Sequence, residues 1–166
     1  MGLVAVTVLA GQLTVGWLDD LLDRDRDKQV GRLDRPVALG WIDPGTVAFW
    51  IAVAVLAVIP LSIANGTYAG LAHLAALASL WLYHLWLKKT FLSWLPYAAA
   101  FGLLPAFLSY GGLGGGMHGG PPTWAMTVLA ALLGIGIHFL VALPDLVQDN
   151  ETGVRHLPLR IALRIG

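Results

Sequence analysis

The chain has 166 residues, of which 57% are hydrophobic and only 12% are charged, and its mean hydropathy is +0.73. A soluble domain carries about a quarter charged residues, so this chain lacks the polar surface to cover itself in water. Its natural solvent is a lipid bilayer. The net charge is zero and no basic stripe is present, which argues against a nucleic-acid partner. Because cysteine is absent, disulfides, thiolate metal sites and cysteine nucleophiles are excluded.

Five apolar stretches predict membrane-spanning helices, because each is close to the ~20 residues that cross ~30 Å of hydrocarbon. They cover residues 2–18, 45–63, 68–87, 91–110 and 123–143. We therefore expect an all-α fold, a polytopic transmembrane helix bundle of about five spans. Residues 1–166 would form a single membrane domain without a convincing internal repeat. The glycine-rich stretch 111–120 predicts a flexible outer loop.

The charged residues are confined to a few segments. Lys and Arg fall only in 24–35, 88–89 and 155–164, and Asp and Glu only in 19–43 and 145–151. With five spans, these segments follow spans one, three and five, so they share one side of the membrane. The positive-inside rule makes that side cytoplasmic.

An acidic run, Asp-Asp-Leu-Leu-Asp-Arg-Asp-Arg-Asp, follows the first span at residues 19–27. Asp20, Asp23 and Asp27 are spaced i, i+3, i+7 and would share one helix face. Two carboxylates ~6 Å apart repel by about 3 kcal/mol at an effective dielectric near 20, so something positive should lie between them. Arg24 and Arg26 would point elsewhere on the helix. Mg²⁺ suits such oxygen ligands, but this run alone leaves a plain solvated loop equally open.

A second acidic pair, Asp145 and Asp149, is spaced i, i+4 at the end of the fifth span. Acids at a helix C-terminus oppose the macrodipole, and the first run does the same. The alternative is a helix end decorated with charge. Two such clusters on one membrane face favour a shared ligand, such as Mg²⁺ with a diphosphate.

Several small or titratable side chains lie within the predicted spans. We expect His73 and His138 to be neutral and hydrogen-bonded between helices, and we leave the role of His84 open. The loop residue His156 has no partner that the sequence identifies. Four glycines in spans three to five predict close helix packing: Gly70, Gly102, Gly134 and Gly136.

Together the motifs resemble those of the UbiA superfamily of intramembrane prenyltransferases. Residues 19–27 look like its N/D-D-x-x-D-x-x-x-D motif, residues 34–36 like the D-R-P that follows, and residues 145–149 like its D-x-x-x-D motif. Tyr83 with Lys88 and Lys89 resembles its Tyr-plus-basic pattern. The resemblance covers nearly the whole chain and corresponds to helices two to six of a family that generally has nine spans. We therefore expect a chain truncated at both ends.

The resemblance implies Mg²⁺-dependent transfer of a prenyl group from a prenyl diphosphate to an acceptor, often aromatic. Two sets of carboxylates would bind the Mg²⁺ ions: Asp20, Asp23 and Asp27 for one, Asp145 and Asp149 for the other. Arg35, Lys88 and Lys89 would contact phosphate oxygens, and Asp19 and Tyr83 would help to bind the substrate. Catalysis would depend most directly on Asp23, Asp145 and Arg35.

Two other functions are compatible with the sequence. One is a degenerate, non-catalytic UbiA-like fragment, and the other is a carrier for a cation or small solute. A carrier usually has polar groups near the bilayer midplane. The spans here are nearly free of them, which favours the prenyltransferase.

Overall fold

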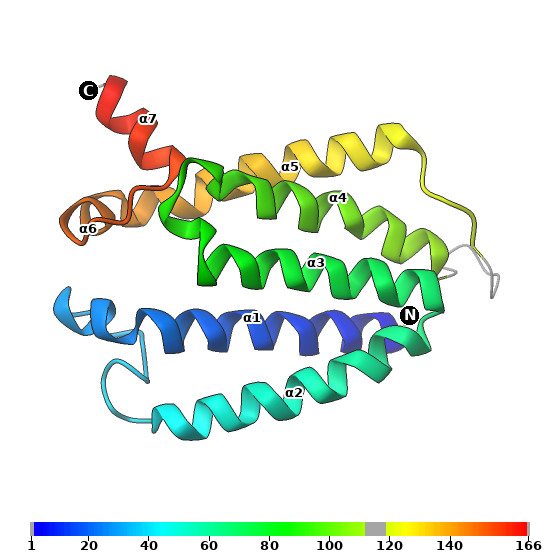
Figure 1. Ribbon diagram of the computed structural model, residues 1–166, viewed down its shortest axis with the longest axis horizontal. Coiled ribbons are helices and arrows are strands. Elements are labelled where there is room, and N and C mark those ends of the chain that lie inside the picture. The colour runs from blue at the N-terminus through cyan, green and yellow to red at the C-terminus, as the bar shows by residue number, and fades with distance from the viewer. Residues whose placement is uncertain (1, 112–118, 166) are drawn as a thin grey trace. The chain divides into compact units, whose positions relative to one another are not determined.

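The computed structural model describes residues 2–111 and 119–165, and these residues form helices and no strands (Figure 1). The prediction of an all-α fold is thereby confirmed. The predicted glycine-rich loop falls largely on residues 112–118, which lie outside the described residues. The chain divides into two compact units, Met1–Leu61 and Ser62–Gly166.

The first unit begins with α1 (Gly2–Gln29), which continues well past the predicted end of the first span. Residues 19–29 contain no Gly, Pro or β-branched residue, so nothing in the acidic run stops the helix. At 1.5 Å per residue α1 is about 42 Å long, against ~30 Å of hydrocarbon. Its charged last turns are therefore long enough to stand outside the hydrocarbon.

The second helix of this unit, α2 (Pro44–Ala64), has a well-defined start. The Thr46 backbone N–H donates to Asp43 Oδ2 at 2.9 Å, an N-cap hydrogen bond. Pro44 follows the cap at a position where a helix needs no N–H. Near the other end, Thr7 Oγ1 donates to the Leu61 carbonyl at 3.3 Å and joins α1 to α2.

In the second unit, α4 (Leu95–Tyr110) packs against both α3 (Thr67–Leu85) and α5 (Trp124–Ala142) (Figure 1). Close packing depends on glycine, as predicted. A Cβ on Gly134 would lie 2.4 Å from the Tyr97 carbonyl oxygen, and one on Gly102 would meet Ala131 at 3.4 Å.

Two further glycines test the same prediction at other places in this unit. A Cβ on Gly70 would come within 2.7 Å of the Ser62 carbonyl oxygen, so the prediction holds there too. It is wrong for Gly136, because apart from its chain neighbours and the backbone of its own helix no described atom lies within 4 Å of the position that its Cβ would take. Gly136 therefore makes no close helix contact.

Short helical segments connect and follow the long helices of the second unit. Two 3₁₀ turns, η1 (Leu87–Lys89) and η2 (Phe91–Trp94), lead from α3 into α4. After α5 come the 3₁₀ turn η3 (Leu143–Asp145), the short α6 (Leu146–Glu151) and α7 (Leu157–Ile165). The basic segment and the second acidic pair both lie in these short elements.

Four helical segments among the described residues are long and apolar enough to cross a membrane: Gly2–Gln29, Pro44–Ala64, Phe91–Tyr110 and Trp124–Glu151. The third predicted span forms a 19-residue helix, α3, as expected. It is less apolar than the other four because two tyrosines and two histidines interrupt it.

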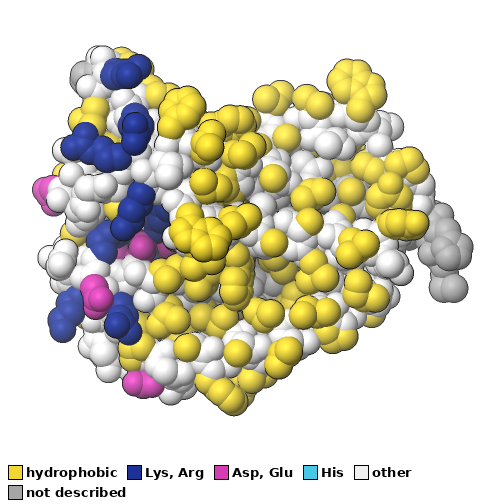
Figure 2. All heavy atoms as spheres, viewed as in Figure 1, with side chains coloured by type: hydrophobic (Ala, Val, Ile, Leu, Met, Phe, Trp, Pro, Cys, Tyr) yellow, Lys and Arg dark blue, Asp and Glu magenta, His cyan; other side chains and the backbone are white. Residues whose placement is uncertain are grey.

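The surfaces of both units agree with the assignment of these helices as membrane-spanning segments. Large apolar side chains are exposed along the long helices, for example Leu9, Leu129 and Leu140. In Figure 2 hydrophobic side chains cover the long helices of each unit, and the charged side chains of each unit gather at one end of its helices. In the first unit this end contains the last turns of α1, and in the second it contains α6 and α7.

Candidate functional site

The first acidic cluster lies on the last turns of α1, as the spacing predicts. Asp20 and Asp23 are partly buried, and Asp27 is almost completely buried, with 1% of its side chain exposed. Asp25, which falls between them in sequence, is 84% exposed. The helix therefore separates the residues assigned to the site from a carboxylate that faces outward.

Arg35 returns from the loop after α1 and contacts this cluster. Its Nη1 donates a hydrogen bond to Asp20 Oδ1, its Nη2 lies 3.5 Å from Asp19 Oδ2, and its Nε lies 3.8 Å from Asp27 Oδ2. Burial alone would lower the pKa of the Arg35 guanidinium. The hydrogen bond that Arg35 donates to Asp20 and the nearby negative charges outweigh burial, so the pKa of Arg35 is raised and the guanidinium stays fully charged. The predicted neighbours Arg35, Asp19, Asp20 and Asp27 are thus brought together.

Arg26 departs from the prediction that it would point away from the acidic face. Its Nη2 lies 3.3 Å from Asp23 Oδ2 and 3.7 Å from Asp27 Oδ1. The long side chain reaches back one turn along the helix, which helix geometry allows for residues three apart. Arg24 pairs with the outward-facing Asp25 at 3.5 Å, as expected for a residue off the acidic face.

Asp27 and Arg35 have unsatisfied hydrogen-bonding atoms in the described structure. Both carboxylate oxygens of Asp27 and Nε of Arg35 are buried without a hydrogen-bond partner there, although they lie within ion-pair distance. A buried charge normally has such partners. A cation on the carboxylate and an acceptor oxygen on Nε would satisfy both groups, so the donor set fits a magnesium diphosphate.

The described residues contain no group of three or more His, Asp or Glu side chains that could hold a metal ion. Mg²⁺ in proteins usually takes one or two carboxylates, keeps water molecules and completes its shell with substrate phosphates. The carboxylates therefore fit Mg²⁺ only as part of such a shared shell.

The second acidic pair lies where the helix is interrupted. Asp145 ends η3 and precedes α6, and Asp149 lies within α6 and is 4% exposed. The sequence predicts both acids at the C-terminus of one long helix. Because α5 ends at Ala142 and a new short helix begins at Leu146, the macrodipole argument does not apply to Asp145.

His156 is the partner of Asp149, a contact that motif spacing alone did not predict. His156 Nε2 lies 2.8 Å from Asp149 Oδ2, and both side chains are buried. The Leu159 backbone N–H donates to His156 Nδ1 at 3.1 Å. Because Nδ1 accepts that hydrogen bond, the ring proton lies on Nε2, which donates to the carboxylate.

A second buried network connects the basic segment to the same end of the unit. Ser93 lies four residues after Lys89. Its Oγ is 3.0 Å from His138 Nε2 and accepts a hydrogen bond from the Leu157 N–H at 3.0 Å. His73 is likewise hydrogen-bonded, to Ser62 at 2.8 Å. The prediction of hydrogen-bonded histidines between helices is confirmed for both.

The remaining predicted residues of this unit lie around that network. Tyr83 is buried, and its ring centroid lies 5.1 Å from that of Tyr97 and 5.7 Å from that of His138. Lys88 and Lys89 form the 3₁₀ turn just before Ser93. The second unit thus gathers the Tyr-plus-basic pattern and the second acidic pair at one end.

The two acidic motifs share a spacing that extends beyond the two Asp residues of each. Both read D-x-x-x-D-x-x-x-G-x-x-x-x-P, over residues 23–36 and 145–158. Both helices end in the same turn: Gly31 and Gly153 have φ of +70° and +77°. The following residue's N–H bonds to the carbonyl of the last Asp, Arg32 to Asp27 at 3.0 Å and Val154 to Asp149 at 2.8 Å. This is a Schellman turn, which favours glycine because φ is positive.

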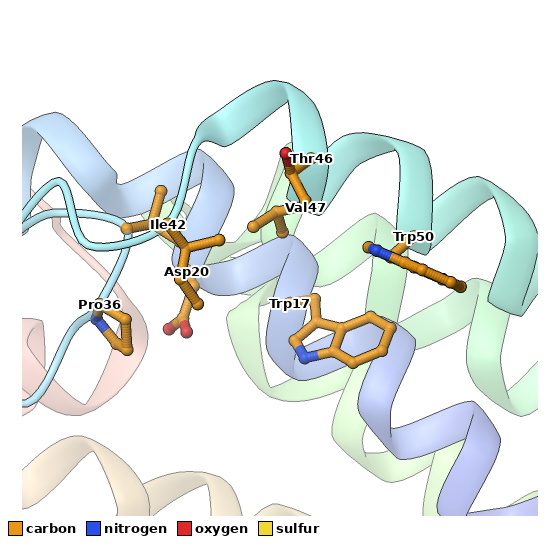
Figure 3. Close-up of a pocket in the computed structure, with 8 residues that line it drawn as sticks. Trp17, Asp20, Pro36, Ile42, Thr46, Val47 and Trp50 are labelled. Carbon is orange, nitrogen blue, oxygen red and sulfur yellow. The ribbon is translucent and has the colours of Figure 1, made fainter.

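A pocket of about 230 Å³ lies in the first unit beside Asp20 (Figure 3). Its lining is mostly apolar, with the indoles of Trp17 and Trp50 on one side and Pro36 and Val47 among the other residues. An apolar pocket that ends near a charged group suits a ligand with a charged head and an apolar tail.

Helices of membrane-spanning length, with an acidic motif at a charged end of each unit, define an integral membrane protein with two carboxylate clusters. The chain matches the UbiA prenyltransferase family over residues 1–165, and it belongs to that family. No curated protein and no solved structure matches it.

Proposed function

We propose that this protein transfers a prenyl group from a prenyl diphosphate to an acceptor, often aromatic, in a Mg²⁺-dependent reaction at the cytoplasmic face of the membrane. Membership of the UbiA family supports a prenyltransferase-type function. The observation that carries the proposal is the buried pair of Asp27 and Arg35, whose atoms without a hydrogen bond a cation and an anionic oxygen would satisfy.

The acidic residues of the two motifs would hold Mg²⁺ and the diphosphate. Bound Mg²⁺ would neutralise the diphosphate and make it a better leaving group. The residues we assign to this role are Asp20, Asp23 and Asp27 in the first unit and Asp145 and Asp149 in the second. Asp19 would help to orient Arg35, whose Nη2 lies 3.5 Å from Asp19 Oδ2.

Arg35 would stabilise the leaving group directly. A guanidinium has five N–H donors, so it can contact phosphate oxygens while remaining beside carboxylates. As the allylic C–O bond breaks, its electron pair goes to the diphosphate, and a fixed cation there lowers the barrier. Lys88 and Lys89 would add positive charge. The acceptor would then bond to the allylic carbon and lose a proton.

The apolar part of the substrate would begin in the pocket beside Asp20. The pocket's polar end belongs to the acidic cluster and its walls are largely apolar and aromatic (Figure 3). An isoprenoid could therefore lie against Trp17 and Trp50 with its diphosphate near Asp20. Tyr83, which is buried against Tyr97 and His138, would help to shape the substrate site.

A transfer assay tests this proposal. Purified protein in lipid nanodiscs would be incubated with Mg²⁺, radiolabelled farnesyl or geranylgeranyl diphosphate and a membrane extract that supplies acceptors. We expect label to move into a new lipid product, and to stay in the diphosphate when EDTA is added or when Asp23→Asn and Asp145→Asn are combined. Mg²⁺-dependent binding without transfer would instead identify a non-catalytic relative. Transfer that persists in the double variant would contradict the assigned site.

A further inference from the structure

His156 makes a contact with the last Asp of the second motif like the one Arg35 makes in the first, from a position one residue earlier. Each follows the last Asp of its motif after a Schellman turn, Arg35 eight residues after Asp27 and His156 seven residues after Asp149. Each side chain contacts that Asp. Arg35 Nε lies at ion-pair distance, 3.8 Å, from Asp27 Oδ2, and His156 Nε2 makes a 2.8 Å hydrogen bond with Asp149 Oδ2. After both motifs, therefore, a side chain beyond the turn contacts the last Asp of the motif.

The two hydrogen bonds of His156 have separate roles. Its Nδ1 accepts from the Leu159 N–H, three residues on, so His156 is the N-cap of α7. Its Nε2–H fixes the orientation of the Asp149 carboxylate. The next residue, Leu157, donates to Ser93 beside the basic segment. One ring therefore connects the start of α7 to the carboxylate.

We propose that His156 is a positioning residue for Asp149. By donating from Nε2 it holds the carboxylate in the orientation that binds the magnesium diphosphate. A ligating carboxylate is commonly oriented by a neighbouring hydrogen-bond donor, and loss of such a donor typically costs about tenfold to a hundredfold in metal affinity or activity. The inference rests on the proposed function, because Asp149 has a ligand to position only if the diphosphate binds there.

Two substitutions at His156 separate the cap from the positioning role. In His156→Asn the side-chain oxygen stands near the place of Nδ1 and can cap α7, since Asn is a good N-cap residue. It is too short to reach Asp149. In His156→Gln the amide nitrogen stands near the place of Nε2 and can still donate to Asp149. His73→Asn is the matched control, because His73 is also buried and hydrogen-bonded but lies near the start of α3.

The experiment measures the binding of farnesyl thiolodiphosphate, an unreactive analogue, to each variant in nanodiscs with Mg²⁺ by calorimetry. Thermal unfolding reports whether each variant folds. We expect His156→Asn to bind about tenfold to a hundredfold more weakly with a wild-type melting temperature. We expect His156→Gln to recover most of the affinity and His73→Asn to bind like wild type.

The possible failures are distinguishable. If wild type binds the analogue and folded His156→Asn binds equally well, the positioning role is contradicted and the proposed function stands. If wild type itself does not bind, the proposed function fails and the inference fails with it. If His156→Asn does not fold, His156→Gln decides the matter, because strong loss of affinity in this variant would contradict the proposal.

Discussion

At the scale of single residues, Arg35 and Asp27 carry most of the argument for a ligand. Arg35 spans Asp19 and Asp20 with its two terminal nitrogens and lies 3.8 Å from Asp27 with Nε. Such a contact depends on a planar, branched donor, which lysine does not offer. The shape of the guanidinium is therefore as important as its charge.

The substitution Arg35→Lys keeps the positive charge and removes the planar, branched guanidinium group. We expect the affinity for Mg²⁺ with farnesyl thiolodiphosphate to fall about tenfold, the factor that corresponds to loss of one charge-assisted hydrogen bond of about 1.5 kcal/mol. Arg32→Lys in the same loop is the control, because Arg32 pairs with the exposed Asp34 at 3.4 Å. Equal affinities of the two variants would remove Arg35 from the site.

The sequence predicted where the acidic residues lie on the helices better than it predicted their contacts. The i, i+3, i+7 spacing correctly placed Asp20, Asp23 and Asp27 on one helix. It could not show that Arg26 folds back onto them, because a flexible side chain chooses among several rotamers. The contact from His156 to Asp149 depends on the chain reversal at Gly153. The shared D-x-x-x-D-x-x-x-G-x-x-x-x-P spacing was the signal that could have revealed it.

At the scale of elements, helix packing in the second unit depends on a few positions without side chains. Gly134 faces Tyr97 and Phe101 of α4, whereas Gly136 on the same helix faces no described atom within 4 Å. Sequence alone treated the two glycines alike, since both lie in an apolar span. Only the orientation of α5 distinguishes them.

These two glycines give a matched pair of substitutions. Gly134→Ala would place a Cβ 2.4 Å from a backbone oxygen, so the helices must separate. We expect it to destabilise the protein by about 1–3 kcal/mol, the usual cost of overpacking. Gly136→Ala should be neutral or slightly stabilising because alanine favours helix. Unfolding by a denaturing detergent in mixed micelles measures both, and equal stabilities would contradict the packing described for α4 and α5.

The helices themselves were predictable from the apolar stretches. Each of the last four predicted spans agrees with an observed helical segment to within two residues at either end. The exception was α1, which runs eleven residues past the predicted Leu18 because the charged run that follows contains no Gly, Pro or β-branched residue to end the helix. The break at Leu143–Asp145 was missed, although Pro144 marks it, because transmembrane helices often tolerate proline.

At the scale of the whole molecule, the main question is how the chain crosses the membrane. Charge placement predicts five crossings with the charged segments in the cytoplasm. Length and composition identify four spanning segments and leave out α3. If α3 does not cross, the basic segment at Lys88 and Lys89 and the acidic run after α1 would lie on opposite sides.

Cysteine labelling distinguishes these topologies. Because the sequence contains no cysteine, each single-cysteine variant is labelled only at the introduced position. The test positions are exposed: Leu33 in the first loop, Thr67 at the start of α3 and Leu92 after it. In intact cells we expect a membrane-impermeant maleimide to label Thr67→Cys only, and Leu33→Cys and Leu92→Cys only after permeabilisation. Labelling of Leu92→Cys in intact cells would show that α3 does not cross.

The central proposal is that both acidic motifs, as the family resemblance implies, take part in binding the magnesium diphosphate. Calorimetric titration of farnesyl thiolodiphosphate with Mg²⁺ tests it on wild type, Asp23→Asn, Asp145→Asn and the double variant. We predict one ligand per chain, a large loss of affinity in each single variant, and a double variant little worse than either, since groups acting as a unit are not additive. Unchanged affinity in either single variant, or two independent binding sites, would contradict the account.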